Sequence, residues 1–170
     1  MRKPKKLPVA IDEEEFVKLI KNTKYPHWKI AFLLGFGSGM RISEVVNLEQ
    51  RDVDFDKKSI HIRQGKGSKD RIVPMPKGLA PKHMKHIPMK CGKRALQFAF
   101  TKTCKVAGLF EKKPELHFHS LRHGFATQCV SNGMPIHHIR TLMGHSNIST
   151  TNVYLELNPT QALKSYEELF

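Results

Sequence analysis

Side chains suited to phosphoryl chemistry gather in a short C-terminal region of the chain. His119 and Arg122 stand three residues apart, and His145 and Tyr154 follow downstream. An arginine stays charged and forks onto two oxygens, an imidazole carries protons, and an ionised phenol is a nucleophile. This set suits the attack of a tyrosine on a phosphodiester, with fixed donors stabilising the charge that develops in the transition state.

Groups further upstream would complete such a site. Arg41 stands between a glycine-rich turn and a short amphipathic segment, where a side chain can approach a phosphate closely. Glu44, one helical turn along, is placed to hold the Arg41 guanidinium from behind. Lys66 lies between two glycines at a hairpin tip, where an ammonium among cations becomes a better acid for the leaving oxygen. A lysine at a turn is also often a solubility residue, and this segment alone favours that interpretation.

The nucleophile of such a reaction has to be a phenolate. A free tyrosine, with a pKa near 10, is only about one part in a thousand ionised at pH 7, and neighbouring guanidinium groups lower that pKa. Tyr25 and Tyr166 compete with Tyr154 for this role, but neither is close in sequence to the cationic cluster. Two arginines would take the place of a metal ion.

The many histidines raise the alternative of a zinc site. Histidines that bind metal usually occur with carboxylates or thiols, and the sequence has neither an HExxH motif nor a close cysteine pair. Cys91, Cys104 and Cys129 are far apart and odd in number, which indicates neither a disulfide framework nor a zinc ribbon. We therefore expect no metal and no cofactor.

The charge balance indicates a polyanionic partner. The 170 residues include 29 Lys and Arg against 15 Asp and Glu, a formal net charge of +14. Nucleic acid is the usual polyanion, and a solubility charge or a membrane-surface patch is the alternative. We expect a nucleic acid as the partner, with additional contacts from Lys3 and Lys5 of the N-terminal arm and from Lys69 and Arg71 of the hairpin.

No segment is predicted to enter a membrane. The apolar run after the basic N-terminus is broken by Pro8 and then meets four acidic residues, so no signal peptide is indicated. No apolar run approaches the length of a membrane span. We expect a soluble, cytoplasmic, nucleoid-associated protein with no membrane partner.

Hydrophobic periodicity predicts a mainly helical α+β domain with one small three-stranded antiparallel sheet. Gly35, Gly37 and Gly39 are expected to interrupt the second helix. A short helix is possible near Met84, inside the connection 74–92. The predicted strands are 52–56, 59–63 and 71–74, and the predicted helices begin near residues 12, 26, 40, 93, 119, 135, 150 and 159. The buried face of the helix at 93–106 is expected to consist of Ala95, Leu96, Phe98, Ala99, Thr103 and Val106.

Five segments, in order, resemble the tyrosine recombinase family (phage integrase, Xer-like). The separation of nine residues between His145 and Tyr154 also fits the family pattern, and the resemblance covers nearly the whole chain. Each segment alone would be a weak signal, whereas five in sequence are specific. The segments are Gly39–Val45, Gly65–Pro74, His119–Thr127, Leu142–Ser146 and Thr150–Tyr154.

The resemblance implies a site-specific DNA recombinase or integrase that cleaves and rejoins strands without metal, through a 3′-phosphotyrosyl intermediate at Tyr154. The family pattern selects the lysine between glycines, so Lys66 is preferred to Lys69 and the solubility interpretation is set aside. The implied roles are the phosphate clamp for Arg41 and Arg122, the general acid for Lys66, acid–base catalysis for His119, a supporting donor for His145 and support of the clamp for Glu44.

The resemblance also shapes the expected organisation. Residues 1–11 are expected to form a basic arm and residues 12–170 the catalytic domain, without the N-terminal DNA-clamping domain that family members usually carry. The chain is then either a fragment of a longer protein or a minimal enzyme, with weak, salt-sensitive DNA binding. Its final helix is expected to dock in cis, or in trans within a tetrameric assembly on DNA.

Two other functions remain open. A catalytically silent DNA-binding or regulatory protein of the same fold would have the same charge but no covalent chemistry. A relaxing enzyme that resembles type IB topoisomerases would share the chemistry without exchanging strands between duplexes.

Overall fold

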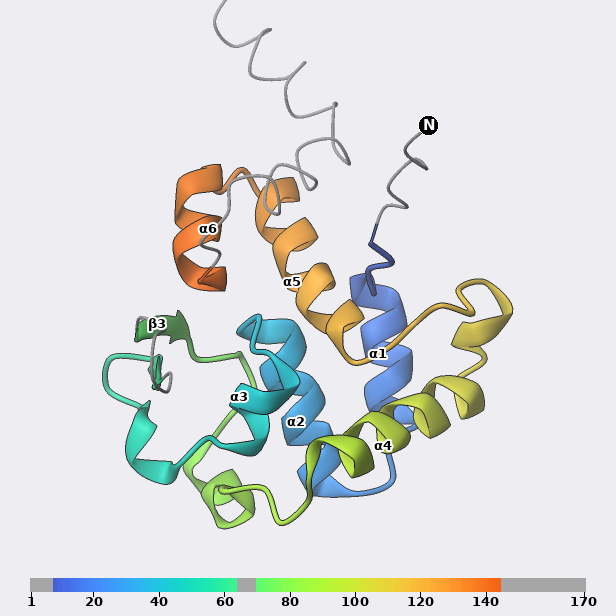
Figure 1. Ribbon diagram of the computed structural model, residues 1–170, viewed down its shortest axis with the longest axis horizontal. Helices are drawn as coiled ribbons and strands as arrows, with labels where there is room; N and C mark the ends of the chain where they lie inside the picture. Colours follow the sequence, from blue (N-terminus) through green and yellow to red (C-terminus); the bar gives the residue numbers. More distant parts are fainter. Residues whose placement is uncertain (1–7, 64–69, 145–170) are drawn as a thin grey trace, which may run out of the picture.

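The computed structural model describes residues 8–63 and 70–144 (Figure 1). Helices dominate, with a three-stranded sheet at one side, which confirms the predicted fold class. None of the helices in these two ranges combines the length and apolar character needed to cross a membrane. The elements are α1 (Glu13–Lys21), α2 (Pro26–Gly37), α3 (Ile42–Val46), η1 (Gln50–Asp52), β1 (Val53–Asp54), β2 (Ser59–Ile62), β3 (Arg71–Pro74), η2 (Pro81–His86), α4 (Lys93–Val106), η3 (Leu109–Glu111), α5 (His119–Ser131) and α6 (Ile136–Met143).

Local signals set the starts of the first two helices. Asp12 and Glu15 form a capping box: each side chain accepts the other residue's backbone N–H, at 2.9 and 3.0 Å. Pro26 occupies the first turn of α2, where its missing N–H costs no hydrogen bond. Both starts match the sequence prediction.

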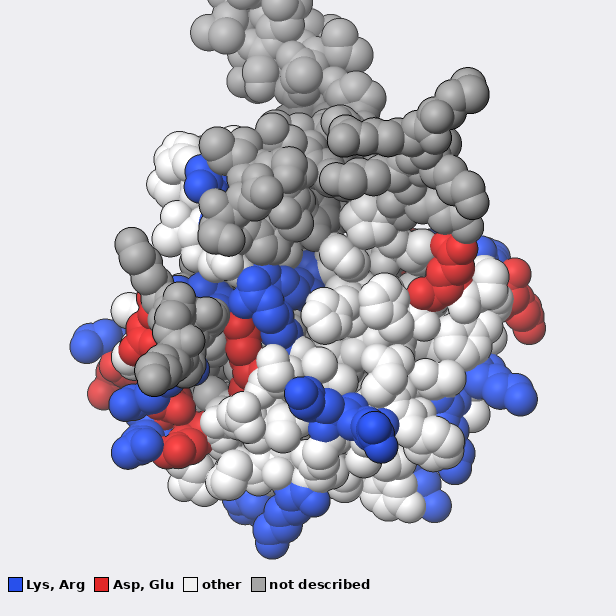
Figure 2. All heavy atoms as spheres, in the orientation of Figure 1, with Lys and Arg blue, Asp and Glu red and all other residues white. Residues whose placement is uncertain are grey.

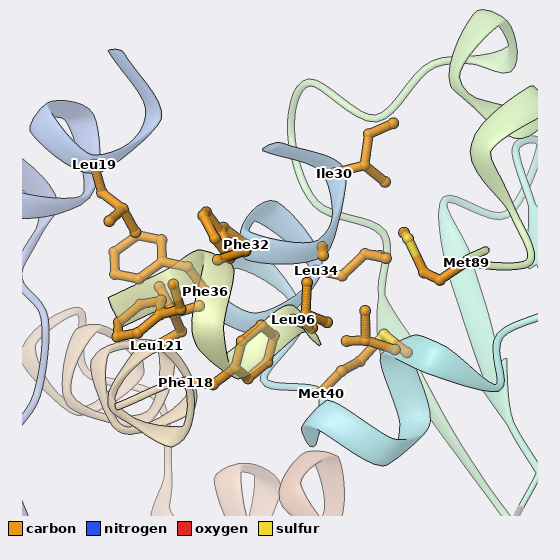
Figure 3. Packing of buried hydrophobic residues seen from close by; sticks show 14 of the residues in the cluster. Leu19, Ile30, Phe32, Leu34, Phe36, Met40, Met89, Leu96, Phe118 and Leu121 are labelled. Carbon is orange, nitrogen blue, oxygen red and sulfur yellow. The ribbon is translucent and has the colours of Figure 1, made fainter. Parts of the chain in front are cut away.

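Helix α2 is the centre of the core, as predicted. Figure 1 shows it surrounded by α1, α3, α4 and α5. Phe32 and Leu34 are fully buried and lie among side chains from neighbouring helices, including Leu96 and Phe118 (Figure 3). The rings of Phe32 and Phe118 meet edge to face with centroids 6.2 Å apart, a preferred aromatic geometry.

The expectation that glycines interrupt α2 is wrong for Gly35 and Gly37, because the helix continues to Gly37. Gly35 has a packing reason instead. A Cβ there would lie 3.1–3.3 Å from Leu121 and Phe118, so the missing side chain lets α5 approach closely. Gly39, beyond the helix, has a left-handed φ of 65° and does form the turn.

The predicted buried face of α4 is partly wrong. Phe98 and Val106 are 67% and 65% exposed, and Ala95 is also exposed. The helix instead buries residues that recur at three and four positions, so the apolar stripe runs through Leu96, Ala99, Phe100, Thr103 and Cys104. The other three positions fall outside this stripe.

The sheet is the predicted antiparallel meander, in the order β1-β2-β3. Ile60 pairs with Val73, and both are buried, whereas Ile72 is 62% exposed. This alternation is the period of two expected of strands with one covered face. The hairpin tip that carries Lys66 and Lys69 lies outside the described residues.

Residues just before α1 pack against the rest of the domain. Ile11 is 1% exposed, and its N–H donates to Ser120 O of α5 at 3.2 Å. Val9 also packs against the core. Two residues of the predicted arm therefore pack on the domain, and Lys3 and Lys5 lie outside the described residues.

Gly124 is the point where this N-terminal segment crosses α5, and it yields a stability prediction. A Cβ at Gly124 would lie 2.3 Å from Ile11 O and 2.8 Å from the Phe36 ring. We expect Gly124→Ala to lower the free energy of unfolding by about 1–3 kcal/mol through overpacking, although alanine favours helices.

Chemical denaturation measures this change. Gly92→Ala is the control, because Gly92 has an ordinary φ of −82° and nothing lies within 4 Å of the added Cβ. A Gly124→Ala protein at least as stable as the Gly92→Ala protein would show that the crossing is not tightly packed.

Candidate active site

Three arginines from separate elements converge on the C-terminal end of α6. Carbonyls at a helix end have no partner within the helix, and cations are favoured there. The three arginines donate to the backbone carbonyls of three consecutive residues, one carbonyl each. The contacts are Arg71 Nε to Leu142 O (2.7 Å), Arg122 Nη2 to Met143 O (2.5 Å) and Arg41 Nη2 to Gly144 O (3.3 Å).

Glu44 links two of these arginines. Its Oε1 accepts from Arg41 Nη1 at 2.8 Å, and its two oxygens accept from Arg71 Nη1 and Nη2 at 2.8 Å each. Glu44 Oε2 also accepts the backbone N–H of Arg41 at 2.7 Å. The hydrogen bond predicted between Glu44 and Arg41 is therefore present, within a larger cluster.

The charge state of Glu44 follows from these contacts. Its side chain is only 9% exposed. Burial alone raises the pKa of Glu44, but hydrogen bonds from Arg71 and Arg41 outweigh it, and the net pKa lies below its ordinary value. Glu44 is thus an anion that fixes both guanidinium groups.

Arg71 belongs to this buried cluster. Its side chain is 6% exposed and directed into the cluster rather than toward the surface. Arg71 is held between Glu44 and Leu142 O, and its predicted contact with DNA stays a prediction.

Arg122 is the most deeply held of the predicted clamp residues. It is 3% exposed, and its Nη1 donates to Gly39 O at 2.6 Å while Nη2 donates to Met143 O. The side chain of Arg41 is 31% exposed. Of the two arginines predicted to clamp a phosphate, Arg122 is therefore buried and Arg41 is partly exposed.

His119 begins α5 beside these cations and is half-buried. Burial lowers its pKa, and the positive charges of His117, Arg122 and Arg41 lower it further, against the opposing effect of Glu44. A neutral imidazole at this place can accept a proton at neutral pH.

The lowered pKa of His119 gives the expected pH dependence of stability. The unfolded state takes up a proton at this residue before the folded state does, so stability is full above the unfolded pKa of about 6.5 and falls as the pH drops below it. We expect His119→Gln to make this decline shallower when melting temperature is measured from about pH 7.5 to about pH 5. An unchanged decline would contradict this expectation. The pKa values of His27 and His83 are lowered as well, and both residues contribute to the decline that remains.

The structure brings together some of the predicted site residues and leaves others untested. Arg41, Glu44, His119 and Arg122 lie in one cluster, as the electrostatic effect on His119 requires. The remaining predicted residues lie outside the described ranges: Lys3, Lys5, Lys66, Lys69, His145 and Tyr154.

The supporting role of Arg71 was missed, although a signal for it exists. Arg71 and Val73 alternate with exposed Ile72, so the period of two already places Arg71 on the inward face of β3. A buried arginine on a strand requires an anion, and the sequence does not show that Glu44 supplies it.

Within the described ranges, no three or more His, Cys, Asp or Glu side chains form a group that could hold a metal ion. The three cysteines are free. Burial raises the pKa of Cys104 to about 12, with a contribution from Glu15, and that of Cys129 to about 11. Both are therefore unreactive thiols at neutral pH.

Comparison with known proteins identifies the family. The model of the phage integrase family matches residues 10–91 and 84–161, most of the chain. The chain belongs to the phage integrase family. This result confirms the resemblance found in the five sequence motifs.

Similar family members include the tyrosine recombinase XerA of Thermococcus onnurineus, which is 33% identical over 97% of this chain. The chain spans 64% of the length of that relative. The crystal structure of a XerA recombinase has a TM-score of 0.76 at 27% identity, with 99% of this chain and 66% of that one covered. A XerH site-specific recombinase bound to a palindromic difH substrate shares the fold, with a TM-score of 0.74 at 21% identity over 95% of this chain and 53% of that one.

Proposed function

We propose that the chain is the catalytic part of a site-specific DNA recombinase that cleaves and rejoins strands through Tyr154. The observation that carries this proposal is the pair of clamp arginines, Arg41 and Arg122, held beside a half-buried His119. Both are fixed by protein acceptors before any substrate binds. Preorganised cations of this kind are what a phosphoryl transition state requires.

The proposed cleavage exchanges one bond to phosphorus for another. The Tyr154 oxygen forms a bond to phosphorus while the bond from phosphorus to the 5′ oxygen breaks. His119 accepts the phenol proton, and Lys66 donates a proton to the departing oxygen. Arg41 and Arg122 bind the nonbridging oxygens, with His145 as a further donor. Rejoining is the reverse, with the 5′ hydroxyl as the nucleophile.

The proposed partner is double-stranded DNA, bound chiefly through phosphates. Figure 2 shows Lys and Arg side chains along much of the outline of the visible face, with a further group near its centre. The net charge of +14 supports a steep salt dependence of binding. Lys3, Lys5 and Lys69 are proposed as further phosphate contacts, in a cytoplasmic protein associated with the nucleoid. Assembly as a tetramer on DNA through the C-terminal segment is part of the same proposal.

A covalent-trapping assay tests the proposed chemistry. The protein is incubated with a nicked double-stranded substrate whose cleavage releases a short fragment, so that rejoining is prevented, and is then denatured. We expect a protein–DNA adduct that persists with EDTA, because the arginines stabilise the charge that a metal would otherwise stabilise. Sequencing the DNA-linked peptide should locate the bond at Tyr154 rather than at Tyr25 or Tyr166.

The assay separates the proposal from its alternatives. Salt-sensitive DNA binding with no adduct, across a randomised set of substrates, would favour a silent DNA-binding protein. An adduct together with relaxation of supercoiled DNA, but no exchange between two duplexes, would favour a relaxing enzyme. Loss of the adduct with EDTA would contradict metal-free cleavage.

A further inference from the structure

One buried guanidinium, that of Arg71, joins two parts of the candidate site. Its Nη1 and Nη2 donate to the two carboxylate oxygens of Glu44, each at 2.8 Å. Its Nε, on the adjacent edge, donates to Leu142 O at 2.7 Å. Glu44 belongs to α3 and Leu142 to α6, so one rigid planar group of β3 bridges the two helices.

The end of α6 also packs directly on the Arg71 side chain. Gly144 has a left-handed φ of 60°, and a Cβ there would lie 2.9 Å from Arg71 Cδ and 3.2 Å from Arg71 Nε. Only a residue without a side chain fits between the turn and the arginine. This steric contact is independent of the hydrogen bonds and indicates the same close fit.

We propose that Arg71 is a positioning residue for the proposed cleavage. Its guanidinium holds Glu44, which in turn holds Arg41, at a fixed position relative to the C-terminal end of α6, the helix that precedes His145 in the sequence. This inference rests on the proposed function. In this proposal Arg71, whose Nε, Nη1 and Nη2 all donate to protein oxygens, makes no contact with the substrate itself. It acts by fixing the position of Arg41 relative to the C-terminal end of α6, after which His145 and Tyr154 follow in the sequence.

The geometry requires an arginine rather than another cation. A guanidinium offers a fork for a carboxylate and a separate Nε–H in the same plane. Lysine has one ammonium on a flexible stem and cannot hold both Glu44 oxygens and Leu142 O in fixed directions. Without Arg71, the Glu44 carboxylate loses two charged donors, and the position of Arg41, which donates to the same carboxylate, is less well fixed.

Variants at Arg71 are therefore expected to lower the rate of cleavage and to leave DNA affinity nearly unchanged. A misplacement of about 1 Å in a catalytic group lowers rates about 10²-fold. We expect Arg71→Lys and Arg71→Met to reduce single-turnover adduct formation at saturating DNA by about that factor, with the Kd changed by less than about threefold. A purely structural role would instead lower the melting temperature without this split between rate and affinity.

Lys113→Met is the matched control. Lys113 Nζ donates to Glu15 Oε2 at 2.6 Å and to Ala10 O at 3.0 Å, so it also joins a carboxylate to a backbone carbonyl. Its partners lie in the first turn of α1 and in the segment just before it, and not in the arginine cluster. We expect Lys113→Met to cleave DNA at the wild-type rate at temperatures where it is folded.

A second variant keeps the test valid if Arg71 variants fail to fold. Gly144→Ala retains every charge and presses on the Arg71 side chain. Gly108→Ala introduces the same left-handed strain at a φ of 69°, but its Cβ would have no neighbour closer than 3.8 Å. We expect Gly144→Ala, and not Gly108→Ala, to slow cleavage by about tenfold or more, in line with the effect of a displaced catalytic group.

A measurement without DNA separates this inference from the proposed function. The pKa of His119, followed by nuclear magnetic resonance, should rise in Arg71→Met, because the Glu44 charge is then less compensated and acts more strongly on the imidazole. It should not change in Lys113→Met. If the wild type forms no adduct, the proposed function fails, and an unchanged His119 pKa overturns the positioning role as well. If the wild type forms the adduct and the Arg71 and Lys113 variants cleave alike, only the positioning role is overturned.

Discussion

Arg122→Lys is expected to lower the rate of adduct formation by about 10³-fold, the upper range for loss of one donor to a transition-state oxyanion. The substitution retains a positive charge but removes the planar guanidinium, which can donate to two phosphate oxygens at once. Arg122 already donates to Gly39 O and Met143 O, and these contacts fix the direction in which the guanidinium meets a phosphate. A lysine ammonium cannot reproduce both contacts and also bind two phosphate oxygens.

The same variant is expected to be less stable, and the two effects must be separated. Gly39 O and Met143 O would each lose a charged donor in a buried place, at about 1–3 kcal/mol for each acceptor left unsatisfied. Single-turnover cleavage should therefore be measured well below the melting temperature of the variant, with folding checked by circular dichroism. The loss of rate should persist under those conditions.

Arg51→Lys is the control for the chemistry of the substitution. Arg51 is 66% exposed and pairs with Glu49 at the surface, so replacing it changes neither a buried contact nor the cluster. Cleavage by Arg122→Lys within about tenfold of the Arg51→Lys rate would mean that Arg122 is a structural residue and not part of a phosphate clamp.

The sequence predicted those parts of the fold whose causes are local. The capping box of Asp12 and Glu15 and the proline at position 26 each act within one helical turn, so the starts of α1 and α2 were correct. The alternation of β3 likewise follows from adjacent residues. The buried face of α4 was also a local question. Its error came from choosing apolar residues such as Phe98 without requiring the helical period.

The contacts that organise the candidate site are not local, and the sequence could not specify them. Arg71 bonds with Glu44, 27 positions away, and with Leu142, 71 positions away. Residue types alone indicate that a buried arginine needs an acceptor, but many acceptors are available along the chain. Only the fold decides that three arginines share the end of α6. The motifs therefore identified Arg41 and Arg122, but they did not show what holds them.

Gly39→Ala is the second large expected effect, because it disturbs both the backbone and the clamp. At a φ of 65°, alanine costs about 1–2 kcal/mol in left-handed strain. Its Cβ would also lie 2.5 Å from the Phe125 ring, and overpacking adds about 1–3 kcal/mol. We expect the free energy of unfolding to fall by about 2–5 kcal/mol, the sum of these two contributions.

Gly108→Ala separates the two contributions to this loss. Its φ of 69° is nearly the same, but the nearest atom to its added Cβ is 3.8 Å away, so only the strain remains. Chemical denaturation should place Gly39→Ala well below Gly108→Ala in stability. Because Gly39 O holds Arg122, the Gly39 variant should also lose at least about tenfold in cleavage under conditions where both variants are folded. Equal stability and equal cleavage of the two variants would show that Phe125 yields to the added methyl group and that the turn at Gly39 does not set the direction of Arg122.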